Sequence, residues 1–207
     1  MTLHDEIWRH LPEERPRDPH ARAFALATVA GAERVLDLGC GDGCLAAEIA
    51  ATGSRVTGVD SSEAALDRAR ARHPELELAR PGDDGSLPFA DGSFDAIVCV
   101  HVLEHVADTQ RLLSEAWRVS SPGGNLAVAV PWHGRLKNLA IALRSFERHH
   151  DPLEPVLRFY TPRSLRDLLT ALGFNDVAVR GAGGVPGFRE TLLARARRHS
   201  VLRPERA

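Results

Sequence analysis

The 207-residue chain lacks an apolar run near the roughly 18 residues that a membrane-spanning helix requires. Its N-terminal segment 1–22 is charged and contains prolines, without the apolar core of a signal peptide. It also lacks an excess of either charge, because 26 Lys and Arg stand against 28 Asp and Glu. This balance gives no excess of positive charge of the kind that binds nucleic acid or an anionic membrane surface. We therefore expect a cytoplasmic protein with no nucleic-acid or membrane partner.

Cysteine is scarce, and its spacing is uninformative for redox or metal chemistry. The three cysteines, Cys40, Cys44 and Cys99, form no C-x-x-C pair, so we expect reduced thiols. The chain also lacks internal repeats and linkers. Its length suits one hydrophobic core, and we predict a single domain over 1–207.

Three glycines at alternate positions are the most informative feature that is present. The apolar run 35–38 is a predicted strand, and Gly39, Gly41 and Gly43 follow it before a helical pattern. Glycine has no Cβ and tolerates positive φ, so the pattern indicates a turn at which the backbone comes very close to a ligand. The dinucleotide fingerprint G-x-G-x-x-G requires glycine at position 44, where this chain has Cys44. A ligand without a pyrophosphate therefore fits better.

Strand and helix patterns alternate along the rest of the chain. We predict strands at 35–38, 55–59, 75–79, 94–100 and 125–130, and a hairpin of 175–179 and 190–194 around the turn 181–187. We predict helices at 20–30, from 45 to a stop at Gly53, from a cap at Ser61 or Ser62 to His73, from a cap at Asp108 to the turn 121–124, at 136–146, and from Thr161 to Gly173. This order indicates an α/β fold with a doubly wound, mostly parallel sheet and one antiparallel strand. Strand 94–100 is apolar on both faces, so we expect it at the centre. Segment 1–19, which carries Trp8, is predicted to be either disordered or a short lid.

The residues around the glycines resemble a known enzyme family. The stretch Asp37-Leu-Gly-Cys-Gly-Asp-Gly43, with Asp60 closing the next strand, is similar to the class I S-adenosylmethionine-dependent methyltransferases. The similarity continues through Leu87–Asp95, Val102-Leu-Glu-His-Val106, Pro122-Gly-Gly124 and Phe159–Pro162, as in the small-molecule branch of that family. It covers roughly residues 35–179. The resemblance implies a seven-stranded Rossmann-like sheet in the order 3-2-1-4-5-7-6, S-adenosyl-L-methionine as cofactor, and a small-molecule methyl acceptor.

The resemblance also assigns roles to the loops that follow the strands, where open α/β sheets bind ligands. Asp60 would accept hydrogen bonds from the ribose hydroxyls. Asp83 would accept a hydrogen bond from the adenine amino group while the backbone N–H of Asp84 donates to the adenine ring. Asp37 would reach the methionine end, often through water. The alternatives are a surface charge, an acidic turn and a capping carboxylate, respectively. The complete set of implied cofactor-binding residues is Asp37, Gly39, Cys40, Gly41, Gly43, Asp60, Ser61, Asp83, Asp84 and Val100.

Histidines are the candidates for the proton acceptor that an O–H substrate requires, because their pKa lies near neutral pH. His133 follows strand 125–130, and His149-His150 lies where the family builds its substrate pocket. We predict His133 and His150 as catalytic residues, although each alone also fits a polar loop. We favour oxygen over nitrogen or carbon as the acceptor atom. The chain lacks an Asn-Pro-Pro-Tyr signature, which argues against methylation of nucleobase amines.

The motif His101-Val-Leu-Glu-His105 also spells H-x-x-E-H, a zinc-site pattern of some metalloproteases. That function needs a regular helix, whereas this motif follows a predicted strand. We favour a role in which Glu104 and His105 take part in hydrogen bonds that fix the loop, and we predict no metal. Metal assistance, as in some quinone-precursor O-methyltransferases with a similar motif, stays an alternative. Two other functions stay open: a non-catalytic cofactor-binding subunit of a larger complex, and a nicotinamide dehydrogenase, against which Cys44 argues.

Overall fold

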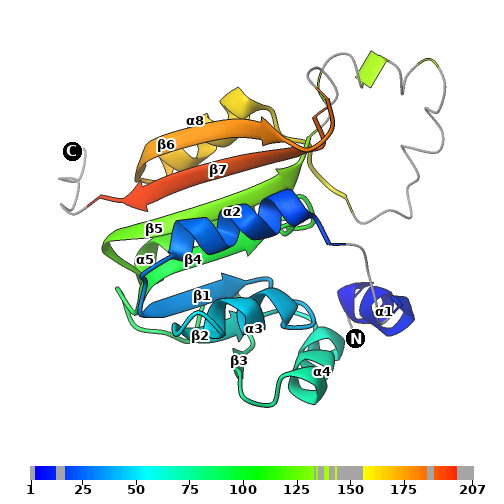
Figure 1. The fold of residues 1–207 in the computed structure, drawn as a ribbon, viewed down its shortest axis with the longest axis vertical. Coiled ribbons are helices and arrows are strands. Elements are labelled where there is room, and N and C mark those ends of the chain that lie inside the picture. Colours follow the sequence, from blue (N-terminus) through cyan, green and yellow to red (C-terminus); the bar gives the residue numbers. More distant parts are fainter. Residues whose placement is uncertain are drawn as a thin grey trace.

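The computed structural model describes residues 3–12, 17–132, 134, 138–139, 143, 156–185 and 189–199. Its strands form one twisted sheet with helices on both faces (Figure 1). The predicted helix at 136–146 lies largely outside the described residues.

The sheet has the strand order that the resemblance implied. Its strands are β1 (Arg34–Leu38), β2 (Arg55–Val59), β3 (Glu77–Ala79), β4 (Phe94–Val100), β5 (Ser120–Pro131), β6 (Phe174–Ala182) and β7 (Thr191–Arg198). They are ordered β3-β2-β1-β4-β5-β7-β6, and β7 runs antiparallel to both of its neighbours while the other pairs are parallel. The doubly wound sheet with one antiparallel strand is therefore confirmed, and β4 lies near its centre.

The helices begin where the sequence provides capping side chains. They are α1 (Leu3–His10), α2 (Pro19–Val29), α3 (Cys44–Ala50), α4 (Glu63–Arg72), α5 (Thr109–Val119) and α8 (Pro162–Ala171). The side chains of Asp18, Ser62, Asp108 and Thr161 cap α2, α4, α5 and α8, so Ser62 rather than Ser61 is the cap of α4. Among the described helices, none has the length and apolar character needed to cross a bilayer.

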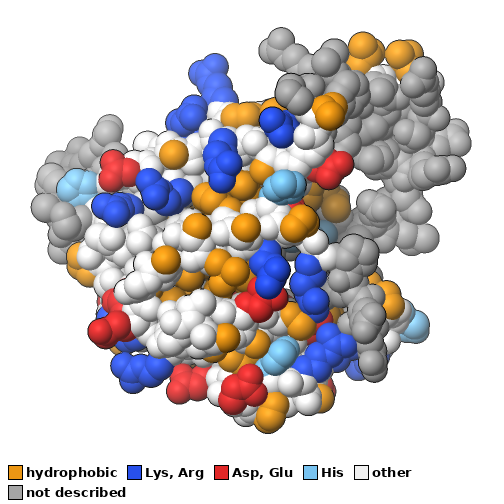
Figure 2. All heavy atoms as spheres, viewed as in Figure 1, with side chains coloured by type: hydrophobic (Ala, Val, Ile, Leu, Met, Phe, Trp, Pro, Cys, Tyr) orange, Lys and Arg blue, Asp and Glu red, His pale blue; other side chains and the backbone are white. Residues whose placement is uncertain are grey.

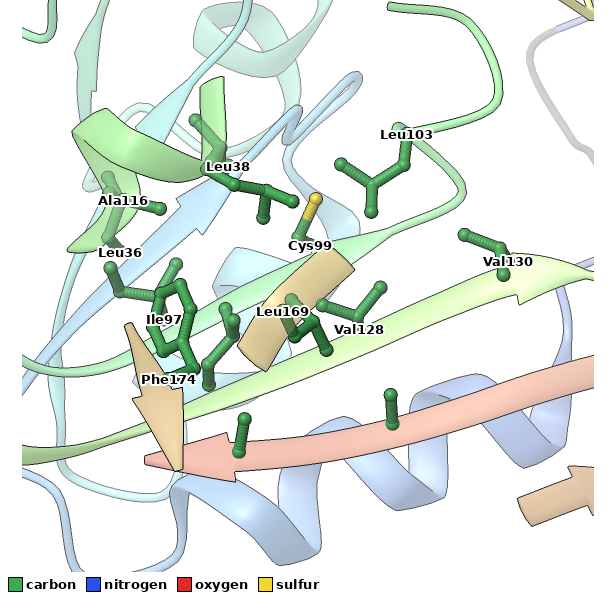
Figure 3. Packing of buried hydrophobic residues seen from close by; sticks show 14 of the residues in the cluster. Leu36, Leu38, Ile97, Cys99, Leu103, Ala116, Val128, Val130, Leu169 and Phe174 are labelled. Atoms are coloured by element: carbon green, nitrogen blue, oxygen red, sulfur yellow. The ribbon is translucent and has the colours of Figure 1, made fainter. Parts of the chain in front are cut away.

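Two hydrophobic layers hold the helices on the sheet. One face of the sheet packs against α5 and α8, and Figure 3 shows Leu36, Ile97 and Val128 of the sheet close to Leu169 of α8. The other face packs against α2 and α3. Replacing one such fully buried leucine with alanine costs about 2–5 kcal/mol. Basic and acidic side chains both occur on the face that α2 and α3 cover (Figure 2), as the balanced composition suggests.

Some element boundaries differ from those predicted. Strand β5 begins at Ser120, so the segment 121–124, expected to be a turn, extends the strand instead. Its start pairs with Phe94, and the register shifts before the regular pairing of Ala96 with Asn125. Strand β3 begins at Glu77 rather than Glu75, because the chain first turns through a hydrogen bond from Leu76 N to His73 O. Both hairpin strands are longer than predicted. Their pairing runs from Phe174 opposite Arg198 to Ala182 opposite Thr191, beyond the predicted ranges 175–179 and 190–194.

Candidate functional site

A cavity of about 650 Å³ opens at the carboxyl ends of β1, β2 and β4, where the strand order reverses. Its walls come from α1, the glycine loop, the loops after β2, β3 and β4, and the first turns of α5. The predicted cofactor residues that line it are Gly39, Asp60, Ser61, Asp83 and Asp84. The remaining ones, Asp37, Cys40, Gly41, Gly43 and Val100, are not in its lining. The loops indicated by the sequence thus meet at one cavity, but half of the residues lie behind its surface.

The glycine loop is closely packed on both sides. Gly39, Gly41 and Gly43 have φ values of 80°, 55° and 77°, which favour glycine over other residues. A Cβ on Gly39 would overlap the side chain of Val102, and a Cβ on Gly41 would lie 2.6 Å from the ring of Trp8. A side chain of α1 therefore occupies the space beside Gly41, where the sequence alone suggested only a ligand.

The helix α1 forms part of the cavity wall. Its Asp5 accepts a hydrogen bond from Ser62 Oγ at 2.8 Å, which joins α1 to the cap of α4. Arg68 of α4 donates to the carbonyl oxygens of Arg9 and Leu11, at 3.3 and 2.9 Å. Within the segment 1–19, for which either disorder or a short lid was predicted, residues 3–10 are thus helical, and Trp8 packs against the glycine loop.

Asp60 connects the end of β2 to the glycine loop. One carboxylate oxygen accepts a hydrogen bond from Gly41 N at 3.0 Å, and the other accepts one from Ser62 N at 2.9 Å. The side chain also lines the cavity. Its position is therefore fixed by backbone donors on both sides, which suits a carboxylate that must hold one orientation toward a ligand.

Asp37 is buried beneath the same loop, with 2% of its surface exposed. Its Oδ2 atom has no hydrogen-bond partner, whereas the carboxyl group accepts a hydrogen bond from Ala46 N. Burial raises the pKa of Asp37, and the charges of Asp60 and Asp42 raise it further, to about 7. The carboxyl group is therefore partly protonated at neutral pH in the ligand-free protein.

The cysteines are free thiols with structural positions. Cys40 is buried against Gly58, where a Cβ would lie 2.9 Å from Cys40 Sγ. Burial raises the pKa of Cys40 and of Cys99 far above the ordinary value, which leaves both thiols protonated and unreactive.

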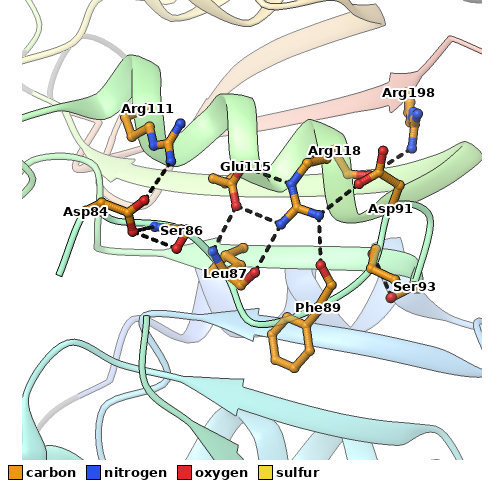
Figure 4. Close-up of polar contacts among 11 residues, drawn as sticks. Asp84, Ser86, Leu87, Phe89, Asp91, Ser93, Arg111, Glu115, Arg118 and Arg198 are labelled. Carbon is orange, nitrogen blue, oxygen red and sulfur yellow. Dashed lines mark hydrogen bonds and ion pairs between the residues drawn. The ribbon is translucent and has the colours of Figure 1, made fainter. Parts of the chain in front are cut away.

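The loop after β3 carries the two acidic residues expected near adenine, and they differ. Asp84 is tied into the turn, since it accepts hydrogen bonds from Ser86 N at 2.9 Å and Ser86 Oγ at 2.6 Å, and it faces Arg111 at 3.4 Å (Figure 4). These hydrogen bonds from Ser86 lower the pKa of Asp84. Asp83 is exposed at the cavity wall. Asp83 is thus the better placed of the two to meet a ligand.

Arg118 fixes this same loop, and the sequence did not reveal its role. Its guanidinium donates to the carbonyl oxygens of Leu87 at 3.0 Å and Phe89 at 2.7 Å, and pairs with Glu115 at 2.7 Å and Asp91 at 2.9 Å (Figure 4). The available signal was the i,i+3 spacing of Glu115 and Arg118 on a helix. That spacing is common on solvated faces, so it does not by itself indicate a loop anchor.

The loop after β4 is organised by the H-x-x-E-H motif. His101 has a φ of 55°, and its ring nitrogens face two carboxylates: Nδ1 lies 3.3 Å from Glu104 Oε1, and Nε2 lies 3.4 Å from Asp18 Oδ2. Burial lowers the pKa of His101, but the hydrogen bonds and charges of Glu104 and Asp18 outweigh it, so the pKa lies above its ordinary value. His105 Nε2 is 3.9 Å from the same Glu104 oxygen. These contacts agree with a role of Glu104 in fixing the loop.

Segment 157–160 is hydrogen-bonded to the loop after β4. The backbone N–H groups of Leu157 and Arg158 donate to Glu104 O at 2.7 and 3.3 Å, and Tyr160 Oη donates to Leu103 O at 3.3 Å. Among the described residues, no group of three or more His, Cys, Asp or Glu side chains is arranged to hold a metal ion. The two histidines predicted to be catalytic, His133 and His150, lie outside the described residues.

The chain is similar to known proteins in sequence and in fold. A family model described as a methyltransferase domain matches residues 36–128. A demethylmenaquinone methyltransferase of Beutenbergia cavernae is 35% identical over 196 residues, which cover 87% of this chain and 77% of that protein. The chain belongs to the class I S-adenosylmethionine-dependent methyltransferases.

One more relative and one solved structure illustrate the range of similar proteins. A malonyl-(acyl-carrier protein) O-methyltransferase of Erwinia billingiae is 32% identical over 172 residues, which cover 77% of this chain and 66% of that protein. The solved structure of phosphoethanolamine N-methyltransferase 2 of Haemonchus contortus, in complex with S-adenosyl-L-methionine, superposes with a TM-score of 0.68 at 17% identity over 95% of this chain and 56% of the other. The chain spans about half, or less, of the length of several curated relatives.

The described residues fit the methyltransferase cofactor. The cavity presents the Asp60 carboxylate, which suits a pair of hydroxyl groups, between apolar walls that include Leu38 and Val102. Below it, the unpartnered Oδ2 atom of Asp37 is a buried acceptor without a donor, and an ammonium group would supply one.

Proposed function

We propose that the chain transfers the methyl group of S-adenosylmethionine to a small-molecule acceptor, most favourably to an oxygen atom. The observation that carries this proposal is the cavity at the carboxyl ends of β1, β2 and β4, whose lining includes the carboxylates of Asp60 and Asp83 and the histidines His101 and His105. When bound, the cofactor supplies an electrophilic methyl group. The name of the Erwinia billingiae relative, an O-methyltransferase, supports an oxygen acceptor.

On the cofactor side, residues of the chain bind the cofactor and fix its orientation. Asp60, held by Gly41 N and Ser62 N, would accept hydrogen bonds from the ribose hydroxyls. Asp83 would accept a hydrogen bond from the adenine amino group. The hydrogen bond from Ser86 N to Asp84 holds the turn that carries Asp83. The helix α1, with Trp8 against the glycine loop, would act as a short lid that excludes water.

On the acceptor side, the cavity is bounded by the apolar side chains of Val102, Val106 and Leu157. Such a surface positions an apolar part of the acceptor and keeps water away, and positioning supplies most of the acceleration of an in-line displacement. We propose that His133 or His150 takes the acceptor proton, because histidine is the natural base near neutral pH.

Calorimetry tests the cofactor assignment. We expect S-adenosylhomocysteine, the demethylated cofactor, to bind in the micromolar range, and NAD to give no signal under the same conditions. Binding of NAD alone would contradict the proposal. The acceptor class is then tested with methyl-labelled cofactor and fractionated small molecules that carry hydroxyl, amine or activated carbon groups. Label transfer to a hydroxyl compound supports the oxygen acceptor, whereas cofactor binding without any label transfer favours a non-catalytic binding subunit.

A further inference from the structure

Two adjacent residues of opposite charge, Arg17 and Asp18, precede α2, and each contacts a different loop of the cavity. Arg17 Nη2 donates to Asp42 Oδ2 in the glycine loop at 3.2 Å and to Cys44 Sγ at 2.7 Å. Asp18 Oδ2 lies 3.4 Å from His101 Nε2, in the loop after β4. These two loops follow β1 and β4, which are neighbours in the sheet and end at the cavity. One dipeptide therefore joins two loops that are far apart in the sequence.

The contact between Asp18 and His101 has the geometry of an ion pair. The other ring nitrogen of His101, Nδ1, lies 3.3 Å from Glu104 Oε1. An imidazole ring donates from both nitrogens only when both are protonated, so a carboxylate at each nitrogen favours the charged form. His101 also lines the cavity with a φ of 55°, which side chains other than glycine rarely adopt. The two carboxylates thus hold the ring of a residue whose backbone needs support.

Asp18 is itself fixed in place from two other elements. Its Oδ1 atom caps α2 by accepting hydrogen bonds from His20 N at 2.9 Å and Ala21 N at 3.0 Å. Its Oδ2 atom also accepts a hydrogen bond from Thr191 Oγ1 at the start of β7. The carboxylate that meets His101 is therefore anchored to a helix and to the sheet, as expected of a group that positions another side chain.

We propose that Arg17 and Asp18 form a bridge that fixes the spacing between the glycine loop and the loop after β4, and that this bridge positions the cofactor-binding residues. This inference rests on the proposed function, because it takes the cavity as the cofactor site. Neither residue is in the described cavity lining, so both act through the loops that they hold. Asp42 follows Gly41, whose N–H donates to Asp60, so displacement of the glycine loop also displaces that carboxylate.

Arg17→Gln removes the first arm of the bridge. Asp42 then keeps its ion pair with Arg72 at 2.8 Å, so its carboxylate is not left without a cation. Arg22→Gln is the matched control, because Arg22 of α2 pairs with Glu48 of α3 and neither residue lines the cavity. The control variant should bind S-adenosylhomocysteine like the parent.

Asp18→Asn removes the charge of the second arm. Asparagine caps a helix about as well as aspartate does, so α2 should still form, and His101 keeps its contact with Glu104. The Cε1 proton of the His101 ring, assigned in NMR spectra by its absence in His101→Gln, reports whether the arm exists in solution. Its titration should move to lower pH in Asp18→Asn, because one of two facing carboxylates has lost its charge, and should stay nearly unchanged in Arg17→Gln.

Calorimetry with S-adenosylhomocysteine measures the effect on the site. We expect Arg17→Gln and Asp18→Asn each to weaken binding at least about fivefold. The double variant should bind about as weakly as the weaker single variant, because a bridge that is cut at one arm no longer joins the loops. Independent effects would instead multiply. Urea unfolding of each variant checks that the protein is folded.

The outcomes separate this inference from the proposed function. Parent-like affinity in either single variant, multiplied effects in the double variant, or an unchanged His101 titration in Asp18→Asn would overturn the bridge while cofactor binding stands. Absence of S-adenosylhomocysteine binding to the parent would overturn the proposed function itself. If Asp18→Asn does not fold, Asp18→Ser takes its place, since serine also caps a helix and cannot pair with His101 as an anion.

Discussion

Two glycines with positive φ, one inside the glycine loop and one before β1, differ in what surrounds them. Gly41 lies beside the ring of Trp8, whereas Gly31, at a φ of 81°, has no atom within 4 Å of where its Cβ would be. Both positions carry the same backbone strain for a branched residue, about 1–2 kcal/mol. Only Gly41 adds a collision.

We predict that Gly41→Val abolishes binding of S-adenosylhomocysteine while the protein stays folded. The branched side chain would push Trp8 and α1 away from the loop that supports Asp60. Calorimetry measures binding, and circular dichroism checks the fold. Gly31→Val is the matched control and should bind like the parent. Retained binding in Gly41→Val would show that the close contact with Trp8 is not needed.

The two histidines that we propose as the base, His133 and His150, give a second prediction at the residue scale. On an authentic acceptor, His133→Ala or His150→Ala should lower turnover roughly a hundredfold, the lower end of general-base contributions, with cofactor affinity little changed. The parent rate should rise with pH through a histidine-like pKa, and the deficient variant should lose that rise. The control is His20→Ala, an exposed position on α2, which should keep the parent rate.

Chelation separates this mechanism from metal assistance. The motif His101–His105 shows contacts among its own side chains and Asp18, so we expect metal-free enzyme to turn over at the full rate. Loss of activity on chelation, with recovery on adding a chosen divalent ion, would assign a metal role to this motif. Unchanged turnover in both His133→Ala and His150→Ala would leave positioning as the mechanism.

At the scale of elements, the loop between β3 and β4 depends on one side chain of α5. We predict that Arg118→Ala lowers the free energy of unfolding by about 2–3 kcal/mol, since it removes charge-assisted hydrogen bonds to two loop carbonyls. It should also weaken S-adenosylhomocysteine binding, because the preceding residues Asp83 and Asp84 line the cavity. Urea unfolding and calorimetry measure the two effects.

The control for this prediction is Arg163→Ala on α8. Its side chain is 90% exposed and makes one ion pair, to Asp167 at 3.6 Å. An exposed pair of this kind contributes little, so neither stability nor binding should change measurably. If Arg118→Ala behaves like Arg163→Ala, the loop is held by its apolar contacts instead.

Elements that are defined by local patterns could be predicted, and those defined by distant contacts could not. Strands β2 and β4 have the bounds that their apolar runs predicted, because those runs are buried between neighbours. Helix α1 was uncertain, since its contacts reach Ser62 and Gly41 far along the chain. The cavity residues Asp60 and Asp83 followed from the family resemblance. The anchoring by Arg118 did not, because the same spacing occurs on solvated helices.

For the whole molecule, titration of Asp37 sets a pH dependence of stability. Its folded pKa of about 7 lies above the ordinary value of about 4, so the folded ligand-free protein holds an extra proton between these values. Stability from this group is therefore present below about pH 4 and is lost as the pH rises toward 7. A carboxylate with a lowered pKa has the opposite effect on stability. Asp95, whose pKa is lowered by its hydrogen bond to Arg34, stabilises the fold at neutral pH, and this stability is lost as the pH falls below about 4.

We predict that the free energy of unfolding of the ligand-free protein falls between about pH 4 and 7, by at most about 4 kcal/mol from this source. Asp37→Asn should remove most of that slope, because the amide does not titrate. Urea unfolding at several pH values, followed by circular dichroism, measures it. A slope that is equal in parent and variant would place the titrating group elsewhere.

The position of Trp8 gives the protein an internal optical reporter. Of its three tryptophans, Trp8 lines the cavity, while Trp117 donates to Gly173 O at 3.2 Å and packs under the guanidinium of Arg198, and Trp132 lies against Gly181. A ligand that enters the cavity changes the surroundings of the Trp8 indole and leaves the other two indoles as they were. The change in emission on ligand addition therefore reports occupancy at submicromolar protein concentration, and purification tags are better attached away from residue 3, where α1 begins.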